Sequence, residues 1–190
     1  VFNIVNGEPE MIGKVLSTNP IIKKITFTGS TEVGKLLMRN SSSTVKNISL
    51  ELGGNAPFII FSDADLDEAI NGFMMAKFRN AGQTCISANR LFVHKSVSNI
   101  LTSKLVERLK KLKVGNGMKD NDIGPLISNE ALKKVIDHVK DAKENGAQIL
   151  FGGNRHKLGG LFYEPTLISN VKKKNEGFSK REFWSYNPIN

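Results

Sequence analysis

The sequence predicts an α/β protein with a parallel sheet covered by helices. Short apolar runs typical of strands alternate with runs in which apolar residues recur at helical spacing. Glycine pairs at 53–54 and 152–153 interrupt this alternation. We interpret the first pair as a domain boundary, because one strand–helix series ends there and another begins, and the second pair as a turn.

Three strands and two helices are predicted before the first glycine pair. The strands are 2–6, 23–29 and 47–52, and the helices are 8–16 and 31–41. This β-α-β-α-β order implies a parallel sheet with helices packed against it.

Four strands and three helices are predicted after that pair. The strands are 56–61, 88–94, 147–153 and 161–169, and the helices are 62–80, 96–113 and 128–146. Asp63 or Asp65 is expected to cap the first of these helices, and Gly146 to close the last. Within 103–113 the apolar residues recur at helical spacing and lysines fill the other side, which predicts an amphipathic helix.

The composition excludes several classes of protein. The hydrophobic fraction is 39% and the charged fraction 24%, as in soluble globular proteins, and the apolar run 56–61 is too short to cross a membrane. One cysteine in 190 residues rules out an intrachain disulfide framework. His94, His138 and His156 lie far apart and have no second ligand at metal-site spacing, so no metal is expected.

The net charge of +9 raises the question of nucleic-acid binding. No binding motif accompanies the charge, and aromatic residues make up only 7% of the chain. We therefore assign the lysines to solvated helix faces and expect no nucleic-acid and no membrane partner. The start of the chain lacks the basic and apolar segments of a signal peptide. The chain begins at Val1 and not at Met, so we interpret it as a fragment of a longer protein.

Two short stretches in the first part of the chain contain residues suited to chemistry. In "FTGSTEVGK" (27–35), Gly29 and Ser30 end a strand and open a helix, where free backbone N–H groups can bind a phosphate. Ser30 is equally well an ordinary N-cap. In "LELGGNAPF" (50–58), Glu51 ends an apolar strand beside two glycines. Its carboxylate could act as a general base, or it could accept hydrogen bonds from the glycine amides.

A third stretch, "FRNAGQTCISANR" (78–90), holds the only cysteine. Cys85 lies in a small-residue loop after a helix, and its neighbours Gln83, Thr84 and Ser87 are polar. A structural thiol usually sits in an apolar run, whereas a loop lets backbone amides converge on an oxyanion. Taken alone, the stretch is compatible with an inert thiol and with a nucleophile.

The three stretches together resemble the aldehyde dehydrogenase superfamily. "LELGG" and "GQTC" match its glutamate and cysteine motifs, and the 34 residues from Glu51 to Cys85 are the spacing of the family. "FTGS", "DADLDEA", "NDIGPLIS" and "GGNRHKLGGLFYEPTLI" extend the resemblance over about residues 1–170. Within the superfamily, the amino-acid sequence around the cysteine is most similar to that of the succinate-semialdehyde dehydrogenase branch.

The resemblance implies a role for each of these residues. Cys85 would be the nucleophile, with its own backbone N–H as an oxyanion donor. Glu51 would activate the water that hydrolyses the thioester. Gly29, Ser30 and Leu52 would contact the cofactor, which is NAD or NADP.

Arg79, six positions before Cys85, carries the implied substrate preference. Its guanidinium fork would bind the carboxylate of a semialdehyde. The alternative is a surface arginine favoured by the dipole of the helix that it ends. Some members of the branch carry a second cysteine two positions after the nucleophile; Ser87 stands there in this chain, so a local disulfide switch is not expected.

The implied reaction is the NAD(P)-dependent oxidation of succinate semialdehyde to succinate, a step of 4-aminobutyrate degradation. Another aldehyde dehydrogenase, of the glutarate-semialdehyde or betaine-aldehyde type, is one alternative, and a truncated product without activity is another. The resemblance implies a homo-oligomer, a dimer or a tetramer, in the mitochondrial matrix or the cytoplasm. It leaves the compartment and the choice between NAD and NADP open.

The resemblance also divides the chain into three parts. Residues 1–52 correspond to the C-terminal part of a Rossmann-type dinucleotide-binding domain, and residues 53–178 to the N-terminal part of the α/β catalytic domain. In residues 179–190, "KREFWSYNPIN" replaces the E-E-x-F-G-P motif of the family. A nucleotide string that encodes "KREFWSYNP", read one nucleotide later, gives K-E-N-F-G-P-I-T. We interpret this divergent tail as a reading-frame slip, which sequencing of the transcript would test.

Overall fold

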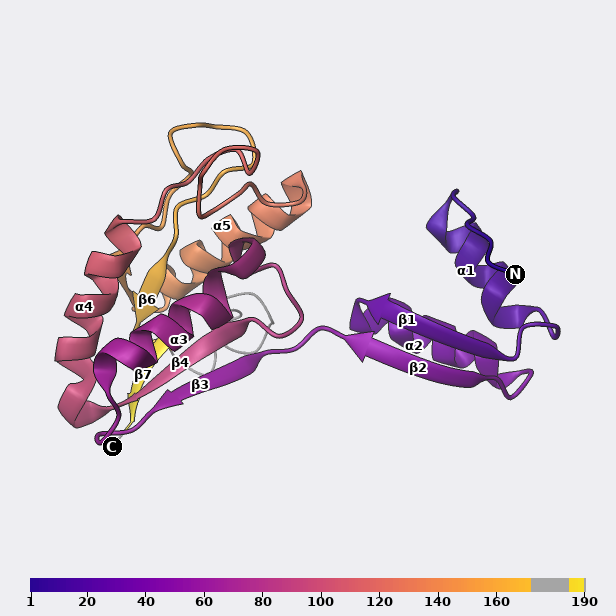
Figure 1. Cartoon of the computed structure of the whole chain (residues 1–190), viewed down its shortest axis with the longest axis horizontal. Helices are drawn as coiled ribbons and strands as arrows, with labels where there is room; N and C mark the ends of the chain where they lie inside the picture. The colour runs from indigo at the N-terminus through magenta and orange to yellow at the C-terminus, as the bar shows by residue number, and fades with distance from the viewer. Residues whose placement is uncertain (172–184, 190) are drawn as a thin grey trace. The chain divides into compact units, whose positions relative to one another are not determined.

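The computed structural model describes residues 1–171 and 185–189 (Figure 1). The chain forms two compact units, Val1–Gly53 and Gly54–Asn190. The boundary falls within the first glycine pair, where the alternation of predicted elements breaks. Each unit is described by itself.

The first unit consists of two helices and two strands: α1 (Pro9–Thr18), β1 (Lys24–Gly29), α2 (Thr31–Ser42) and β2 (Asn47–Leu52). Strands β1 and β2 pair in parallel from Lys24 opposite Asn47 to Gly29 opposite Leu52. Helix α2 makes the crossover between them, as the β-α-β pattern predicts. Both strands are half-exposed.

The strand expected at residues 2–6 does not form. These residues have no regular structure, and Phe2, Ile4 and Val5 are 88%, 76% and 71% exposed. A strand needs the hydrogen bonds of a neighbour, and the described ladder of this unit contains β1 and β2 alone. The apolar residues of this segment therefore gave a wrong prediction of a strand.

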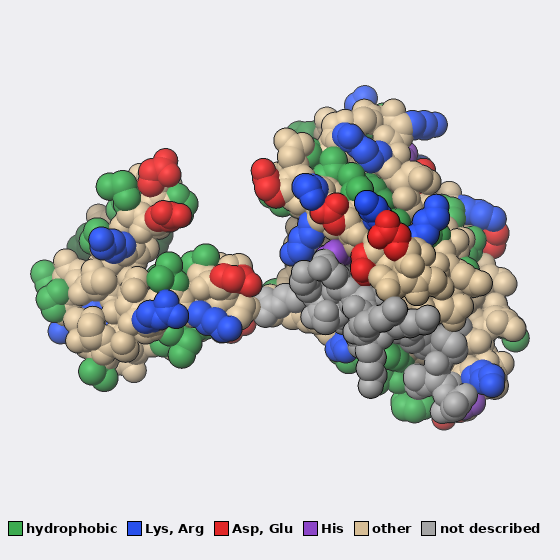
Figure 2. All heavy atoms as spheres, turned by 180° about the vertical axis from the view of Figure 1, so that it is seen from behind, with side chains coloured by type: hydrophobic (Ala, Val, Ile, Leu, Met, Phe, Trp, Pro, Cys, Tyr) green, Lys and Arg blue, Asp and Glu red, His purple; other side chains and the backbone are tan. Residues whose placement is uncertain are grey.

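Exposed apolar side chains are numerous on the first unit (Figure 2). Those on its helices and the loop before β1 are Met11, Val15, Leu16, Ile21, Val33, Leu36 and Met38. Exposed apolar surface of this kind favours association with another surface.

The second unit contains one sheet and its covering helices: β3 (Ala56–Ile60), α3 (Leu66–Phe78), β4 (Ala88–His94), α4 (Ser98–Lys110), α5 (Asn129–Glu144), β5 (Gln148–Phe151), β6 (Leu167–Ser169) and β7 (Ser185–Ile189). The strand order is β3-β4-β7-β6-β5, with β5 antiparallel to β6 and the other neighbours parallel. Strand β7 lies within the tail predicted to be divergent. The rest of that tail, residues 179–184 and 190, lies outside the described residues.

Strand β4 and helix α4 supply much of the core of this unit. Leu91 and Val93 of β4 are 2% and 0% exposed. Leu101, Leu105 and Leu109 form a buried stripe at four-residue spacing along α4, as the amphipathic pattern predicts. This core fixes both ends of the segment between α3 and β4, in which Cys85 lies.

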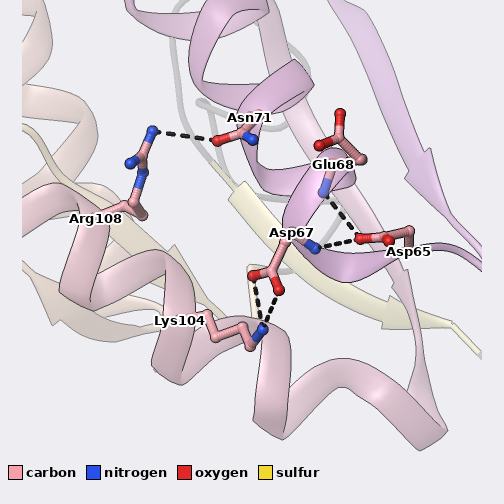
Figure 3. Close-up of polar contacts among 6 residues, drawn as sticks. All are labelled: Asp65, Asp67, Glu68, Asn71, Lys104 and Arg108. Carbon is pink, nitrogen blue, oxygen red and sulfur yellow. Dashed lines mark hydrogen bonds and ion pairs between the residues drawn. The ribbon is translucent and has the colours of Figure 1, made fainter.

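Helix α3 begins at a side-chain cap (Figure 3). The carboxylate of Asp65 accepts hydrogen bonds from the backbone N–H groups of Asp67 (2.9 Å) and Glu68 (3.1 Å). Of the two aspartates expected to cap this helix, the structure therefore selects Asp65 rather than Asp63. The cap satisfies two of the backbone donors that a helix start leaves without a partner.

Polar contacts also join α3 to α4 on the surface (Figure 3). Lys104 Nζ lies 2.6 Å from Asp67 Oδ1, and Arg108 donates to Asn71 Oδ1 over 3.3 Å. These exposed contacts contribute little to stability. They border an open depression of about 390 Å³, which contains none of the residues predicted for catalysis or binding.

The turn after β5 shortens two predicted strands. Gly152 and Gly153 have φ of +67° and +93°, a left-handed conformation that ends the strand. A Cβ at Gly152 would clash with the carbonyl oxygen of Pro165. The second glycine pair is thus a turn, as predicted, while the strand expected over 161–169 is formed at Leu167–Ser169 alone.

Tyr163 closes this turn and yields a testable pH effect. Its hydroxyl donates to Gly153 O over 2.9 Å, and burial, with a smaller effect of the Glu164 charge, raises the pKa of Tyr163 to about 12. Because the unfolded chain loses this proton near its ordinary value of 10, the stability that the shift represents is complete below pH 10 and declines as the pH rises to 12. In an absorbance titration we expect a tyrosinate transition near pH 12 that disappears in Tyr163→Phe and persists in Tyr186→Phe. The opposite pattern would contradict this prediction.

Candidate active site

The segment between α3 and β4 has an unusual backbone. It begins with η1 (Arg79–Gly82), a turn that is not a regular helix, in which Asn80, Ala81 and Gly82 have φ of 52°, 54° and 78°. Three successive left-handed residues are rare, and for a residue with a Cβ this conformation costs about 1–2 kcal/mol. Backbone strain of this kind occurs at functional sites, where the surrounding structure enforces it.

Cys85 lies in a tight turn directly after this strained segment. The backbone N–H of Ser87 donates to Thr84 O over 3.2 Å, so Cys85 and Ile86 form the tip of the turn. The thiol of Cys85 is free and exposed. Its backbone N–H has no hydrogen-bond partner among the described residues, so it is available to a bound oxyanion.

A glycine in the neighbouring strand entry allows this turn to fit. A Cβ at Gly54 would lie 2.8 Å from the carbonyl oxygen of Cys85. The chain entering β3 therefore packs directly against the turn, and a side chain there would displace it. An exposed thiol in a backbone held this closely differs from the buried, inert cysteine of an apolar core.

Arg79 ends α3 and is exposed. Its guanidinium makes no hydrogen bond or ion pair with the described residues, which leaves its donors available to a ligand. Arg79 also lies at the C-terminus of the helix, where the helix dipole favours a positive charge. Its position is therefore compatible with a carboxylate-binding residue and with a surface arginine that only interacts with the dipole. Arg79 and Cys85 belong to one continuous loop in the second unit.

Gln83 was not predicted to have a role, yet its side chain joins this loop to a distant segment. Its Oε1 accepts from the backbone N–H of Ile127 over 2.9 Å. Its Nε2 donates to the carbonyl oxygens of Pro125 and Asn80, each over 3.3 Å. Both of its distant partners belong to "NDIGPLIS", residues 121–128. No residue pattern around Gln83 signalled this contact.

Lys77 was also missed. Its side chain is 2% exposed, although it is charged. Lys77 follows Ile70 and Phe73 on the buried face of α3. A charged residue at a core position of the helical pattern is unusual, and this could have singled out Lys77 in the sequence. It lies eight residues before Cys85.

The other predicted residues gather at one edge of the first unit. Gly29 and Leu52 are the last residues of the two parallel strands and lie opposite each other, and Glu51 pairs with Thr28. The carboxyl ends of parallel strands are where ligands bind in open α/β sheets. Register therefore brings Gly29, Ser30, Glu51 and Leu52 together at one edge. Arg79 and Cys85 lie in the other unit.

Ser30 caps α2. Its Oγ accepts a hydrogen bond from the backbone N–H of Val33 over 3.2 Å, so the side chain acts as the ordinary N-cap that one of the two interpretations expected. Thr31 Oγ1, in the first turn of the helix, is buried and has no hydrogen-bond partner among the described residues. A helix start that follows a strand and glycine, with an unsatisfied hydroxyl beside it, fits the binding of a pyrophosphate.

Glu51 and Leu52 differ in their surroundings. The side chain of Glu51 is exposed, whereas Leu52 is half-buried. A Cβ at Gly34 of α2 would lie 2.8 Å from Leu52 Cδ2, so the leucine packs directly on the helix backbone. This packing fixes the end of β2 and leaves the preceding carboxylate in solvent.

Within residues 1–171 and 185–189, no three His, Cys, Asp or Glu side chains are grouped to hold a metal ion. No helix in the same ranges has the length and apolar character needed to cross a membrane.

Comparison with known proteins decides the family. Residues 1–183 match the sequence model of the aldehyde dehydrogenase family. The chain belongs to this family. A probable succinate-semialdehyde dehydrogenase [NADP(+)] of Sinorhizobium fredii is 54% identical over 91% of this chain and 36% of its own length. The succinate-semialdehyde dehydrogenase [NADP(+)] of Escherichia coli is 48% identical over 96% of this chain and 38% of its own length.

Solved structures confirm the α/β aldehyde dehydrogenase fold. An NADP-dependent enzyme of E. coli superposes with a TM-score of 0.95 at 45% identity, over 100% of this chain and 40% of that one. The betaine aldehyde dehydrogenase of Staphylococcus aureus in complex with NAD+ gives a TM-score of 0.88 at 35% identity, over 96% of this chain and 37% of that one. The chain thus spans well under half of the length of these relatives.

Proposed function

We propose that this chain is the part of an NAD(P)-dependent succinate-semialdehyde dehydrogenase that carries its nucleophile. The observation that carries the proposal is the loop from Arg79 to Cys85, which joins an exposed thiol to an available guanidinium in one strained backbone. The two relatives described first above are named as a probable succinate-semialdehyde dehydrogenase and a succinate-semialdehyde dehydrogenase, which supports a substrate with a carboxylate.

The chemistry begins at Cys85. Its thiolate attacks the aldehyde carbon, a C–S bond forms, and the carbonyl electron pair moves to oxygen, where the Cys85 backbone N–H stabilises the charge. Collapse of this thiohemiacetal releases the hydride and leaves a thioester. When bound, NAD or NADP supplies the hydride acceptor. Gly29 and Ser30 would contact its pyrophosphate, and Leu52 would make a further contact with the cofactor.

Hydrolysis of the thioester is the proposed task of Glu51. The carboxylate takes a proton from a water molecule, and the resulting hydroxide adds to the thioester carbonyl. The C–S bond then breaks, the Cys85 thiolate leaves, and succinate is released. An exposed carboxylate at the end of a strand, as Glu51 is, can exchange this proton with solvent between turnovers.

Arg79 provides the test of the substrate. In the full-length protein, Arg79→Ala is expected to lower kcat/KM for succinate semialdehyde by about 100-fold, the loss expected for charge-assisted hydrogen bonds to a carboxylate. Activity toward butanal, which has the same chain length without the carboxylate, should change little. Steady-state kinetics with both aldehydes measure this preference. Arg108→Ala, which removes an exposed arginine of α4, is the matched control.

Two outcomes would contradict the role of Arg79. One is an equal loss of activity toward both aldehydes, since that would indicate a general defect of the loop. The other is an unchanged preference, which would leave Arg79 as a surface residue at the end of α3.

Glutarate semialdehyde is a second candidate substrate. A glutarate-semialdehyde dehydrogenase of Pseudomonas aeruginosa is 48% identical over 91% of this chain and 36% of its own length. Arg79 would bind either carboxylate, so the comparison of kcat/KM for the two semialdehydes decides between them. Betaine aldehyde is cationic, and the positive charge of Arg79 disfavours it.

Assembly and location are part of the same proposal. We propose a dimer or tetramer for the full-length protein, in the cytoplasm or the mitochondrial matrix. The relatives from rice and rat are named as mitochondrial enzymes. The remaining alternative is a truncated product without activity. Under either interpretation we expect that the 190-residue chain expressed by itself does not oxidise aldehydes.

A further inference from the structure

Lys77 is the charged residue most completely enclosed in the described structure. Its exposed fraction is 2%, and it projects from the face of α3 that carries Ile70 and Phe73 in the core. Removing an ammonium group from water is unfavourable unless hydrogen bonds and charges replace the lost hydration. A methionine would fill such a position without that loss. The amine is therefore expected to do something that packing alone does not require.

The hydrogen-bond partners of Lys77 come after Cys85 in the sequence, whereas Lys77 itself comes before it. Its Nζ donates to Asn89 Oδ1 over 2.6 Å and to Ser87 Oγ over 3.2 Å. Ser87 and Asn89 are 1% and 4% exposed. Lys77 precedes Cys85 by eight residues, while Ser87 and Asn89 follow it by two and four. One side chain thus ties the end of α3 to the start of β4 and closes the loop at its base.

The strained backbone rests on the same amine. A Cβ at Gly82 would lie 3.1 Å from Lys77 Nζ and 3.1 Å from Lys77 O. The left-handed segment that ends at Gly82 therefore packs directly over the ammonium group, three residues before the thiol. Ser87 Oγ also lies 3.5 Å from Lys77 O, at the limit of a hydrogen bond. The backbone and the side chain of Lys77 thus contact the loop on both sides of Cys85, at Gly82 before it and at Ser87 after it.

We propose that Lys77 is a positioning residue: its buried amine fixes the geometry of the Cys85 turn through Ser87 and Asn89. This inference rests on the proposed function, in which Cys85 is the nucleophile. The thiol is attached to the tip of a turn with no core packing of its own, so the bonds at the base of the loop set where it points. Loss of these bonds leaves the substrate and cofactor contacts intact and misplaces the reacting sulfur.

The test is Lys77→Met in the full-length protein, with two readouts. We expect kcat for succinate semialdehyde to fall by at least about tenfold, with KM for aldehyde and cofactor within about twofold, because misplacement affects the reacting atom rather than binding. The alkylation rate of Cys85 by iodoacetamide, followed by mass spectrometry of the Cys85 peptide, should change in the same variant. Lys104→Met, which removes an exposed lysine of α4, should alter neither readout.

A second variant covers the case in which Lys77→Met does not fold. Ser87→Ala removes one of the amine's hydrogen bonds and leaves the lysine in place. We expect a smaller drop in kcat, about threefold, with the same unchanged KM and an altered alkylation rate. Adding Ser87→Ala to a folded Lys77→Met should cause little further loss, because both substitutions remove one interaction.

Three results would overturn the inference. They are an unchanged kcat and alkylation rate in folded Lys77→Met, a loss that appears in KM alone, and an unchanged alkylation rate in Ser87→Ala. Alkylation requires no aldehyde, so it decides the role of Lys77 even where the assignment of the substrate fails. A failure of the proposed function shows instead as absent aldehyde oxidation in the wild-type protein.

Discussion

Replacing Cys85 with serine is expected to lower kcat for aldehyde oxidation by at least about 10³-fold in the full-length protein, as removal of a nucleophile does. Serine has nearly the same size and fits the exposed tip of the turn, so the fold should not change. Its hydroxyl is a far weaker nucleophile at neutral pH than a thiol, part of which is ionised. Reduced-cofactor absorbance after addition of succinate semialdehyde measures the loss.

Chemical modification supplies an independent control for this substitution. Because Cys85 is the only cysteine of the chain, alkylation of this segment labels one position. Inactivation by iodoacetamide should follow the labelling of the Cys85 peptide, and preincubation with substrate should slow both. Turnover in Cys85→Ser above about a tenth of the wild-type rate would exclude a covalent role for this residue.

The local sequence predicted the elements that run through the core. The leucine stripe of α4 and the strand at 88–94 were correctly placed because each has a clear period and one buried face. The strand predicted at 2–6 did not form because pairing is not a local property: its apolar residues suit a strand, yet the described sheet of that unit contains β1 and β2 alone. The residue pattern predicts which segments can form a strand, and the presence of a neighbouring strand determines which of them do.

The site was predicted in part for the same reason. Gly29 and Leu52 come together because parallel strands of equal length end together, so their position follows from the fold class. An exposed Cys85 in a loop followed from its polar neighbours. The left-handed run at Asn80 and Ala81 did not follow, because neither residue type demands positive φ.

Contacts between distant segments were beyond the local pattern altogether. Gln83 reaches Pro125 and Ile127, 42 and 44 residues further along the chain. Nothing near Gln83 indicates that its side chain will face that segment. Lys77 was closer to being predictable, since a charge at a buried helical position calls for a partner, but its partners follow from the return of β4 along α3.

Glu51→Gln is expected to separate the two halves of the proposed reaction. The amide cannot take a proton from water, so hydrolysis of the thioester should slow by about 10²–10⁴-fold, the usual contribution of a general base. Thiol attack and hydride release do not use this carboxylate. The variant should therefore give a burst of reduced cofactor equal to the enzyme concentration, followed by slow turnover.

Stopped-flow absorbance would record this burst, and mass spectrometry of the Cys85 peptide would detect the accumulated acyl group. Glu10→Gln, an exposed glutamate of α1, is the matched control and should leave burst and turnover unchanged. Loss of the burst together with turnover would mean that Glu51 acts before the thioester forms, as a base for the thiol. Retention of full turnover would leave Glu51 as a surface residue at the end of β2. The size of the burst thus decides at which step the glutamate works, which its position opposite Thr28 does not determine.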